Sequence, residues 1–140
     1  MFDNDDPDQR EELIQALQAV GLEAGEWDSG GGITHVITPL LDPYSDPPTI
    51  NAQDPALRSE FEGGLQVWPH EASLYIATNS LQTTCDIGLM GSDGRTGDQV
   101  ATANWEHVDS LEEAVSLFQQ LWDERDRWLR AFLVGELDRQ

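Results

Sequence analysis

Hydrophobic positions recur at helical spacing near the start of the chain. Asp6 can accept a hydrogen bond from the first N–H groups of a helix, and Pro7 already has a suitable backbone angle. Apolar residues then return every three or four positions until Gly21, and glycine commonly ends helices. The pattern therefore predicts an N-terminal helix over residues 7–20.

A longer apolar stripe with the same spacing predicts a C-terminal helix. Asp109 or Ser110 can cap its start, because a glutamate stands three residues after each of them. Gly135 is expected near its end. The apolar positions of this helix are Leu111, Ala114, Val115, Phe118, Leu121, Trp122, Leu129 and Phe132, with Trp128 at the margin.

Between the two helices, alternating or β-branched apolar runs predict strands. The runs cover residues 22–28, 33–40, 65–68, 73–79, 84–90 and 100–106. Short polar connections favour antiparallel neighbours. We therefore expect an α+β fold, in which an antiparallel sheet of about five to six strands carries the N-terminal helix and the long C-terminal helix on one face.

One segment, residues 41–64, interrupts this regular pattern. Prolines and aspartates predominate there and oppose a strand, so we expect a long loop with a turn of helix around residues 56–60. Loops of this length in compact domains are often functional, which makes this one a candidate partner arm. The length of 140 residues predicts a single domain over residues 1–140.

Charge changes the picture most. The chain has 27 acidic residues against seven basic ones, all arginine, so its formal net charge is -20 and it contains no lysine. Over a folded surface of roughly 7,000 Å², this is about one net charge per 350 Å², some threefold sparser than on duplex DNA. Direct binding to nucleic acid or to an anionic membrane is therefore excluded, and a basic or apolar-surfaced protein is the expected partner.

The arginines have an ordinary structural role in this pattern. Asp123 precedes Arg127 by four residues on the C-terminal helix, and Asp126 precedes Arg130 by the same spacing. An acid four residues before a base stabilises a helix modestly. We therefore expect these arginines to support the helix rather than to bind a ligand.

Candidate catalytic residues are few. His35, His70 and His107 do not occur at metal-ligand spacing, and Cys85 lies in an apolar strand-like run. A lone cysteine in such a run usually behaves as a small hydrophobe, so neither a metal nor another cofactor is expected. A hydrolase or metal-dependent enzyme that uses the histidines remains an alternative.

Cellular location is inferred from what the sequence lacks. A single cysteine allows no internal disulfide, the first residues have no secretion-signal pattern, and no apolar run is long enough to span a membrane. We expect a cytoplasmic protein with a folded core.

The acidity leaves several functions open. We expect a non-enzymatic protein that binds another protein, with a surface adapted at least partly to high salt, since a halophilic surface favours carboxylates over lysine. One alternative is a nucleic-acid mimic or immunity-type inhibitor of a basic DNA- or RNA-binding protein. Another is a small dimeric chaperone or adaptor, with a homodimer formed through aromatic residues of the C-terminal helix.

The residues nominated for a partner surface are acidic or aromatic and lie in two regions. They are Asp42, Tyr44, Asp46, Glu60 and Glu62 on the loop, and Trp122 and Trp128 on the C-terminal helix.

Overall fold

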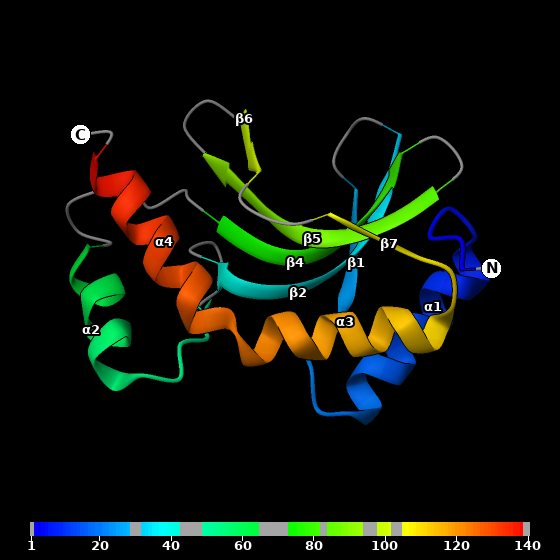
Figure 1. Cartoon of the computed structure of the whole chain (residues 1–140), viewed down its shortest axis with the longest axis horizontal. Helices are drawn as coiled ribbons and strands as arrows, with labels where there is room; N and C mark the ends of the chain where they lie inside the picture. The colour runs from blue at the N-terminus through cyan, green and yellow to red at the C-terminus, as the bar shows by residue number, and fades with distance from the viewer. Residues whose placement is uncertain are drawn as a thin grey trace. The chain divides into compact units, whose positions relative to one another are not determined.

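The computed structural model describes residues 2–28, 32–42, 49–64, 73–81, 84–93, 98–101 and 105–138. The fold is α+β, as predicted, with helices toward both ends of the sequence and an antiparallel sheet formed by the strands (Figure 1). The chain divides into two compact units. Unit 1 consists of Met1–Thr38, Ile76–Leu89 and Ala103–Trp122, and unit 2 of Pro39–Tyr75, Met90–Thr102 and Asp123–Gln140.

The strands follow the order β1-β2-β4-β5-β6, with β3 also paired to β2 and β7 also paired to β5. The predicted strand at residues 100–106 is replaced by two short strands, β6 and β7, and the one at residues 65–68 lies outside the described residues. The strand bounds are Gly25–Asp28 for β1, Thr34–Asp42 for β2, Thr49–Ile50 for β3, Ser73–Leu81 for β4, Thr84–Asp93 for β5, Asp98–Ala101 for β6 and Glu106–Val108 for β7.

Helix α1 (Pro7–Ala19) confirms the predicted N-terminal helix and its caps. Oδ1 of Asp6 accepts a 2.9 Å hydrogen bond from the backbone N–H two residues later. At the other end Gly21 has a φ of 90°, and the N–H of Leu22 donates to the carbonyl of Leu17 at 3.0 Å. This arrangement is a Schellman motif, which ends the helix and satisfies its last carbonyls.

In unit 1, α1 and α3 (Leu111–Asp123) lie on the same side of the strands (Figure 1). Ser110 caps α3, because its Oγ accepts a 3.1 Å hydrogen bond from the N–H of Glu113. Both helices bury their apolar faces and form the core of the unit. Its buried residues include Leu13, Ile14 and Leu17 of α1, Ala114, Leu117, Phe118 and Leu121 of α3, and Val36, Ile76, Ile87 and Leu89 of the strands.

A buried polar network connects the N-terminal segment to this core. Asn4 is fully buried, and its Nδ2 donates to the carbonyl of Thr34 at 3.4 Å and to Oγ1 of Thr78 at 3.3 Å. Its Oδ1 accepts a hydrogen bond from the hydroxyl of Ser80, and its carbonyl accepts one of 2.9 Å from Nη1 of Arg10. These bonds compensate for the burial of the amide, which would otherwise be unfavourable.

In unit 2, helices α2 (Pro55–Gly64) and α4 (Arg125–Asp138) are in contact. The carboxylate of Asp126, in the first turn of α4, accepts backbone hydrogen bonds from Gln53 at 2.7 Å and from Asp54 at 2.9 Å. Both donors lie just before α2. The start of α4 is therefore fixed to the start of α2.

Asn51 extends this anchoring to the sheet. Its backbone N–H donates to the carbonyl of Leu40 at 2.9 Å, and its side chain donates to the carbonyl of Pro39 at 2.7 Å. Nε of Arg125 in turn donates to the carbonyl of Asn51. Within unit 2, the end of β2, the segment before α2 and the first residue of α4 are thus joined by consecutive hydrogen bonds.

The C-terminal helical stretch is in fact two helices, because α3 and α4 are separated at Glu124. The N–H of Arg127 donates to the carbonyl of Glu124 at 3.1 Å, which begins a new helical turn. Arg130 forms its ion pair with Asp54 at 2.8 Å, whereas the carboxylate of Asp126 accepts backbone N–H groups. The predicted pair of Asp126 with Arg130 is replaced because each side chain has a partner near α2.

The predicted loop at residues 41–64 contains more regular structure than expected. It holds the end of β2, strand β3 and all of α2, which extends the predicted turn of helix to ten residues. Asp54 caps α2 by accepting a 3.0 Å hydrogen bond from the N–H two residues later, and Pro55 follows at the first helical position. Burial of Leu57 and Phe61 then stabilises the helix within unit 2.

The buried amide network yields a stability prediction. Changing Asn4→Ala should lower the free energy of unfolding by about 1–3 kcal/mol, because the buried Thr78 and the half-buried Ser80 lose hydrogen bonds. Urea denaturation followed by circular dichroism measures the change. Gln18→Ala, at an exposed position of α1, is the control and should change stability by no more than about 0.5 kcal/mol. Equal stabilities of the two variants would contradict this role of Asn4.

Candidate functional site

His107 lies between two carboxylates where β7 pairs with β5. In this antiparallel register His107 is opposite Asp86. Its Nε2 is 2.6 Å from Oδ1 of Asp109, and its Nδ1 is 3.6 Å from Oδ1 of Asp86. Since a carboxylate faces each ring nitrogen, the geometry favours the imidazolium, in which both nitrogens carry a proton.

The electrostatic surroundings agree with this geometry. The hydrogen bond to Asp109 raises the pKa of His107 above its ordinary value of 6.5, and the charges of Asp109 and Asp86 act in the same direction. The carboxylates of Glu106 and Glu113 line the adjoining pocket. These surroundings therefore favour the protonated form of His107.

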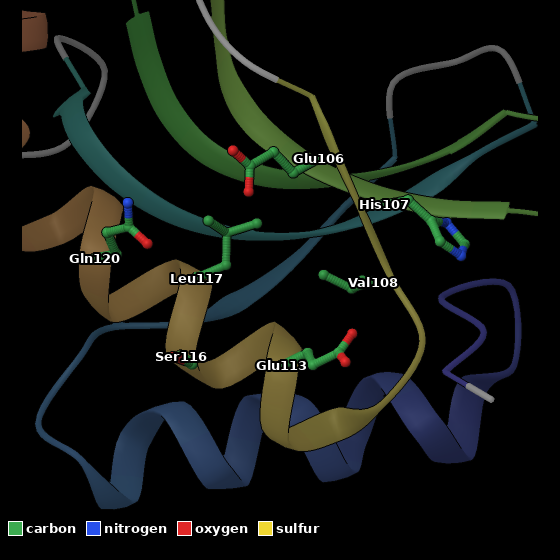
Figure 2. Close-up of a pocket in the computed structure, with 7 residues that line it drawn as sticks. All are labelled: Glu106, His107, Val108, Glu113, Ser116, Leu117 and Gln120. Atoms are coloured by element: carbon green, nitrogen blue, oxygen red, sulfur yellow. The ribbon is translucent and has the colours of Figure 1, made fainter.

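At His107, β7 and α3 line an open surface pocket of about 310 Å³ (Figure 2). In the close-up, Glu106 and His107 leave β7 on opposite sides, and Glu106 extends on the side of Leu117. Val108 and Leu117 are buried and form the apolar part of the lining. The remaining lining residues are exposed and polar, namely Glu106, His107, Glu113, Ser116 and Gln120.

Glu113 has a second role at the start of α3. Its Oε2 accepts a 2.9 Å hydrogen bond from the backbone N–H of Asp109, while its own N–H donates to Ser110. These reciprocal bonds resemble a capping box and fix the carboxylate at the pocket. The carbonyl of Asp109 also accepts a 2.8 Å hydrogen bond from the N–H of Phe2, so the N-terminal segment is fixed at the same place.

Unit 1, which contains this pocket, has many negative charges and almost no arginine to compensate for them. Unit 1 contains 14 of the 27 acids and one of the seven arginines, which gives it a formal charge of -13. That arginine, Arg10, has a side chain only 11% exposed and pairs with Glu26 at 3.1 Å. Twelve of the 14 acids are exposed, and Asp6 and Asp86 are half-buried. The surface of unit 1 is therefore a coat of carboxylates.

Unit 2 has nearly the same number of acids but a different balance. It contains 13 acids and six arginines, for a formal charge of -7. The two units are of similar length, with 72 and 68 residues. The charge difference therefore comes from the distribution of arginine and not from that of the acids.

The other titratable candidates are poorly placed for catalysis. Burial raises the pKa of Cys85 to about 12, so the thiol is protonated and weakly nucleophilic at neutral pH. His35 is buried, with Nδ1 2.5 Å from the carbonyl of Thr78 and its ring 5.4 Å from that of Trp27. His70 lies outside the described residues.

The part of the chain that the structure describes offers neither a cluster of metal-ligating side chains nor a membrane-spanning helix. Within those ranges, no three or more His, Cys, Asp and Glu side chains are grouped so that they could hold a metal ion. No helix in the same ranges is both long enough and apolar enough to cross a bilayer.

The residues nominated on the loop belong to unit 2 and are only partly described. Asp42 is half-buried at the end of β2, where it pairs with Thr49. Glu60 is exposed on α2. Glu62 belongs to the same helix, but its side chain is not described, and Tyr44 and Asp46 lie outside the described residues. The structure thus leaves these residues as a prediction.

The two nominated tryptophans are partly exposed, and their role at a partner surface stays a prediction. Trp122 near the end of α3 and Trp128 on α4 are half-buried, and Phe132 is only 5% exposed. The guanidinium of Arg127 lies 5.1 Å from the ring centroid of Trp128. Among the described residues, Val20 is the one large hydrophobic side chain classed as exposed.

The pocket was not predicted from the sequence, although the spacing of its α3 residues is visible there. Glu113, Ser116, Leu117 and Gln120 are spaced by three and four residues, which places them on one face of a helix. Leu117 was absent from the predicted apolar stripe, yet it is 9% exposed in the structure. The pairing of β7 with β5 could not be found from local patterns, because it joins segments about twenty residues apart.

Comparisons with models of protein families, with curated proteins and with solved structures found no match.

The surroundings of His107 yield a prediction of pH-dependent stability. Because its pKa is raised by folding, its stabilising contribution is fully present below its ordinary value of 6.5 and is lost as pH rises through the folded value. Wild type should therefore be more stable than His107→Gln in mildly acidic buffer, and the difference should shrink toward about pH 9. Denaturant midpoints of the two proteins across this range measure the effect. A difference that stays constant or grows with pH would contradict it.

Proposed function

We propose that this protein is a non-enzymatic binding protein whose unit 1 recognises a basic surface on another protein. The observation that carries the proposal is the charge of unit 1, where 14 acids are accompanied by one arginine. An uncompensated field of this kind attracts cationic partners and speeds their association.

The position of Arg10 strengthens this argument. Its guanidinium donates to the carbonyl of Asn4 and to the carboxylate of Glu26, and little of the side chain is exposed. The one arginine of the unit therefore presents little positive charge to a partner. His107 is the other cation that could offset the field, and it already pairs with Asp86 and Asp109.

Chemical reactivity supports binding over catalysis. The raised pKa of Cys85 removes the thiolate that a nucleophilic mechanism needs. His35 is buried against Trp27 and a backbone carbonyl of β4, which suits a structural histidine. A nucleic-acid mimic or immunity-type inhibitor is one form of this function, since its target would also be basic.

Adaptation to high salt is a second candidate, and one observation favours it. The acids are divided almost equally between the units, 14 and 13, as expected if carboxylates coat the whole surface for hydration. The absence of lysine agrees with the same explanation, because lysine stems add apolar surface. The two proposals are compatible. Salt adaptation explains the even distribution of acids, and partner binding explains the scarcity of arginine in unit 1.

Charge-neutralising variants test where a basic partner binds. The unit 1 variant combines Glu12→Gln, Glu23→Gln and Glu112→Gln, all at exposed positions. The variant for the nominated loop combines Asp46→Asn, Glu60→Gln and Glu62→Gln and changes net charge equally. With fluorescent protamine, an arginine-rich protein, as probe, the unit 1 variant should slow association about two- to fivefold at low salt. The loop variant should slow it less.

Stopped-flow anisotropy gives the association rates, and circular dichroism checks that both variants are folded. Equal slowing by the two variants would contradict recognition through unit 1. Wild-type protein that fails to bind protamine at low salt would contradict the binding function itself.

The salt proposal predicts a separate effect on folding. Screening of like charges is largely complete by about 1 M salt, where the Debye length is about 3 Å. The thermal midpoint should therefore rise steeply from about 0.05 M to about 1 M potassium chloride, and adaptation to concentrated salt predicts a further rise toward about 3 M. A midpoint that falls above about 1 M would contradict the adaptation.

A further inference from the structure

The pocket between β7 and α3 combines three properties that a single basic side chain requires. Its volume of about 310 Å³ is at the lower end of the range for ligand pockets, so it suits a small group. Val108 and Leu117 supply apolar contact. Glu106 and Glu113 supply negative charge at the rim.

Apart from His107, which already pairs with Asp86 and Asp109, the polar lining offers several acceptors from two different elements. Glu106 comes from β7, whereas Glu113 and Gln120 lie about two turns apart on α3 (Figure 2). Ser116 lies between these two α3 residues in sequence and adds a hydroxyl. Because Glu113 is held by its bond to the N–H of Asp109, at least one carboxylate is positioned before a ligand arrives.

Arginine fits this lining better than lysine does. Its planar guanidinium carries five N–H donors that can reach acceptors in different directions, whereas the lysine ammonium has three donors on one atom. Its aliphatic stem can cover Val108 and Leu117 while the charged head stays at the rim. The guanidinium is also more weakly hydrated, so it loses less on entering a partly apolar pocket.

We propose that this pocket receives an arginine side chain from an extended segment of the basic partner protein. This inference rests on the proposed function, and it adds one anchoring point to an otherwise diffuse electrostatic attraction. Buried arginines at interfaces often contribute much of the binding energy, because they are enclosed by residues that exclude water.

The test uses a fluorescein-labelled peptide of alternating glycine and arginine. Two matched peptides replace every arginine by lysine or by citrulline, which keeps the shape of arginine but lacks its charge. The arginine peptide should bind about three- to tenfold more tightly than the lysine peptide, and the citrulline peptide should not bind measurably. In NMR titrations, the largest amide shifts should occur at Val108, Ser116 and Leu117.

Variants then separate the pocket from the general charge of unit 1. Glu106→Gln removes a pocket carboxylate and should weaken the arginine peptide about three- to tenfold. Glu112→Gln is the matched control, since this exposed neighbour on α3 does not line the pocket, and its effect should be clearly smaller. Ser116→Trp should also weaken binding by filling the pocket, and its exposed helical position should tolerate the larger side chain.

The outcomes distinguish this inference from the proposed function. Equal weakening by Glu106→Gln and Glu112→Gln, or equal affinity for the arginine and lysine peptides, overturns the arginine pocket and leaves binding by the charged surface intact. Free spermidine that competes as strongly as the peptide overturns the assignment to a protein segment. If the wild type binds neither cationic peptide at low salt, the proposed function fails together with the pocket.

Discussion

The fold depends on how so many carboxylates are accommodated with so few cations. In the described residues, many carboxylates accept hydrogen bonds from backbone N–H groups. Asp6 and Asp54 cap α1 and α2, Glu113 bonds the segment before α3, and Asp126 accepts two N–H groups that precede α2. Charge-assisted bonds to the unsatisfied N–H groups at helix starts are favourable for an anion. The acids thus stabilise helix starts and chain connections without needing lysine or arginine.

Two arginines bind the other backbone group, because they donate hydrogen bonds to carbonyls. Arg10 donates to the carbonyl of Asn4, and Arg125 donates to the carbonyl of Asn51. The first bond joins α1 to the segment before it, and the second joins α4 to the segment before α2. Burial lowers the pKa of Arg125, and the nearby charges of Asp126 and Asp123 oppose that shift. The guanidinium of Arg125 joins two chain segments, whereas Arg130 forms an exposed ion pair with Asp54 in unit 2.

The features that the sequence predicted well are those determined by neighbouring residues. The ends of α1 follow from Asp6, Pro7 and Gly21, and the start of α3 follows from Ser110 and Glu113. Local spacing contains this information, because capping involves residues at most a few positions apart. Strands β4 and β5 were likewise recognisable from their apolar patterns.

The features that it missed depend on distant partners. At the break, residues on α4 form hydrogen bonds with residues more than seventy positions away. Arg125 donates one to Asn51, and Asp126 accepts one from Gln53. The apolar stripe is interrupted here by the charged run at residues 123–127, but helical spacing continues on both sides, so the pattern alone predicted one continuous helix. The pocket depends in the same way on β7 lying beside β5 and on α3 returning across it. Its lining residues were individually visible in the sequence, but their association was not.

Binding and salt adaptation make different demands on the same surface. A uniform acidic coat explains why the two units carry 14 and 13 acids, but it does not explain why six of seven arginines belong to unit 2. A specific electrostatic surface requires a local imbalance, because charges beyond about 8 Å are screened at physiological salt. Removing arginine from one unit creates that imbalance without adding further acids. The distribution of the scarce charge is therefore more informative about function than the abundance of the common one.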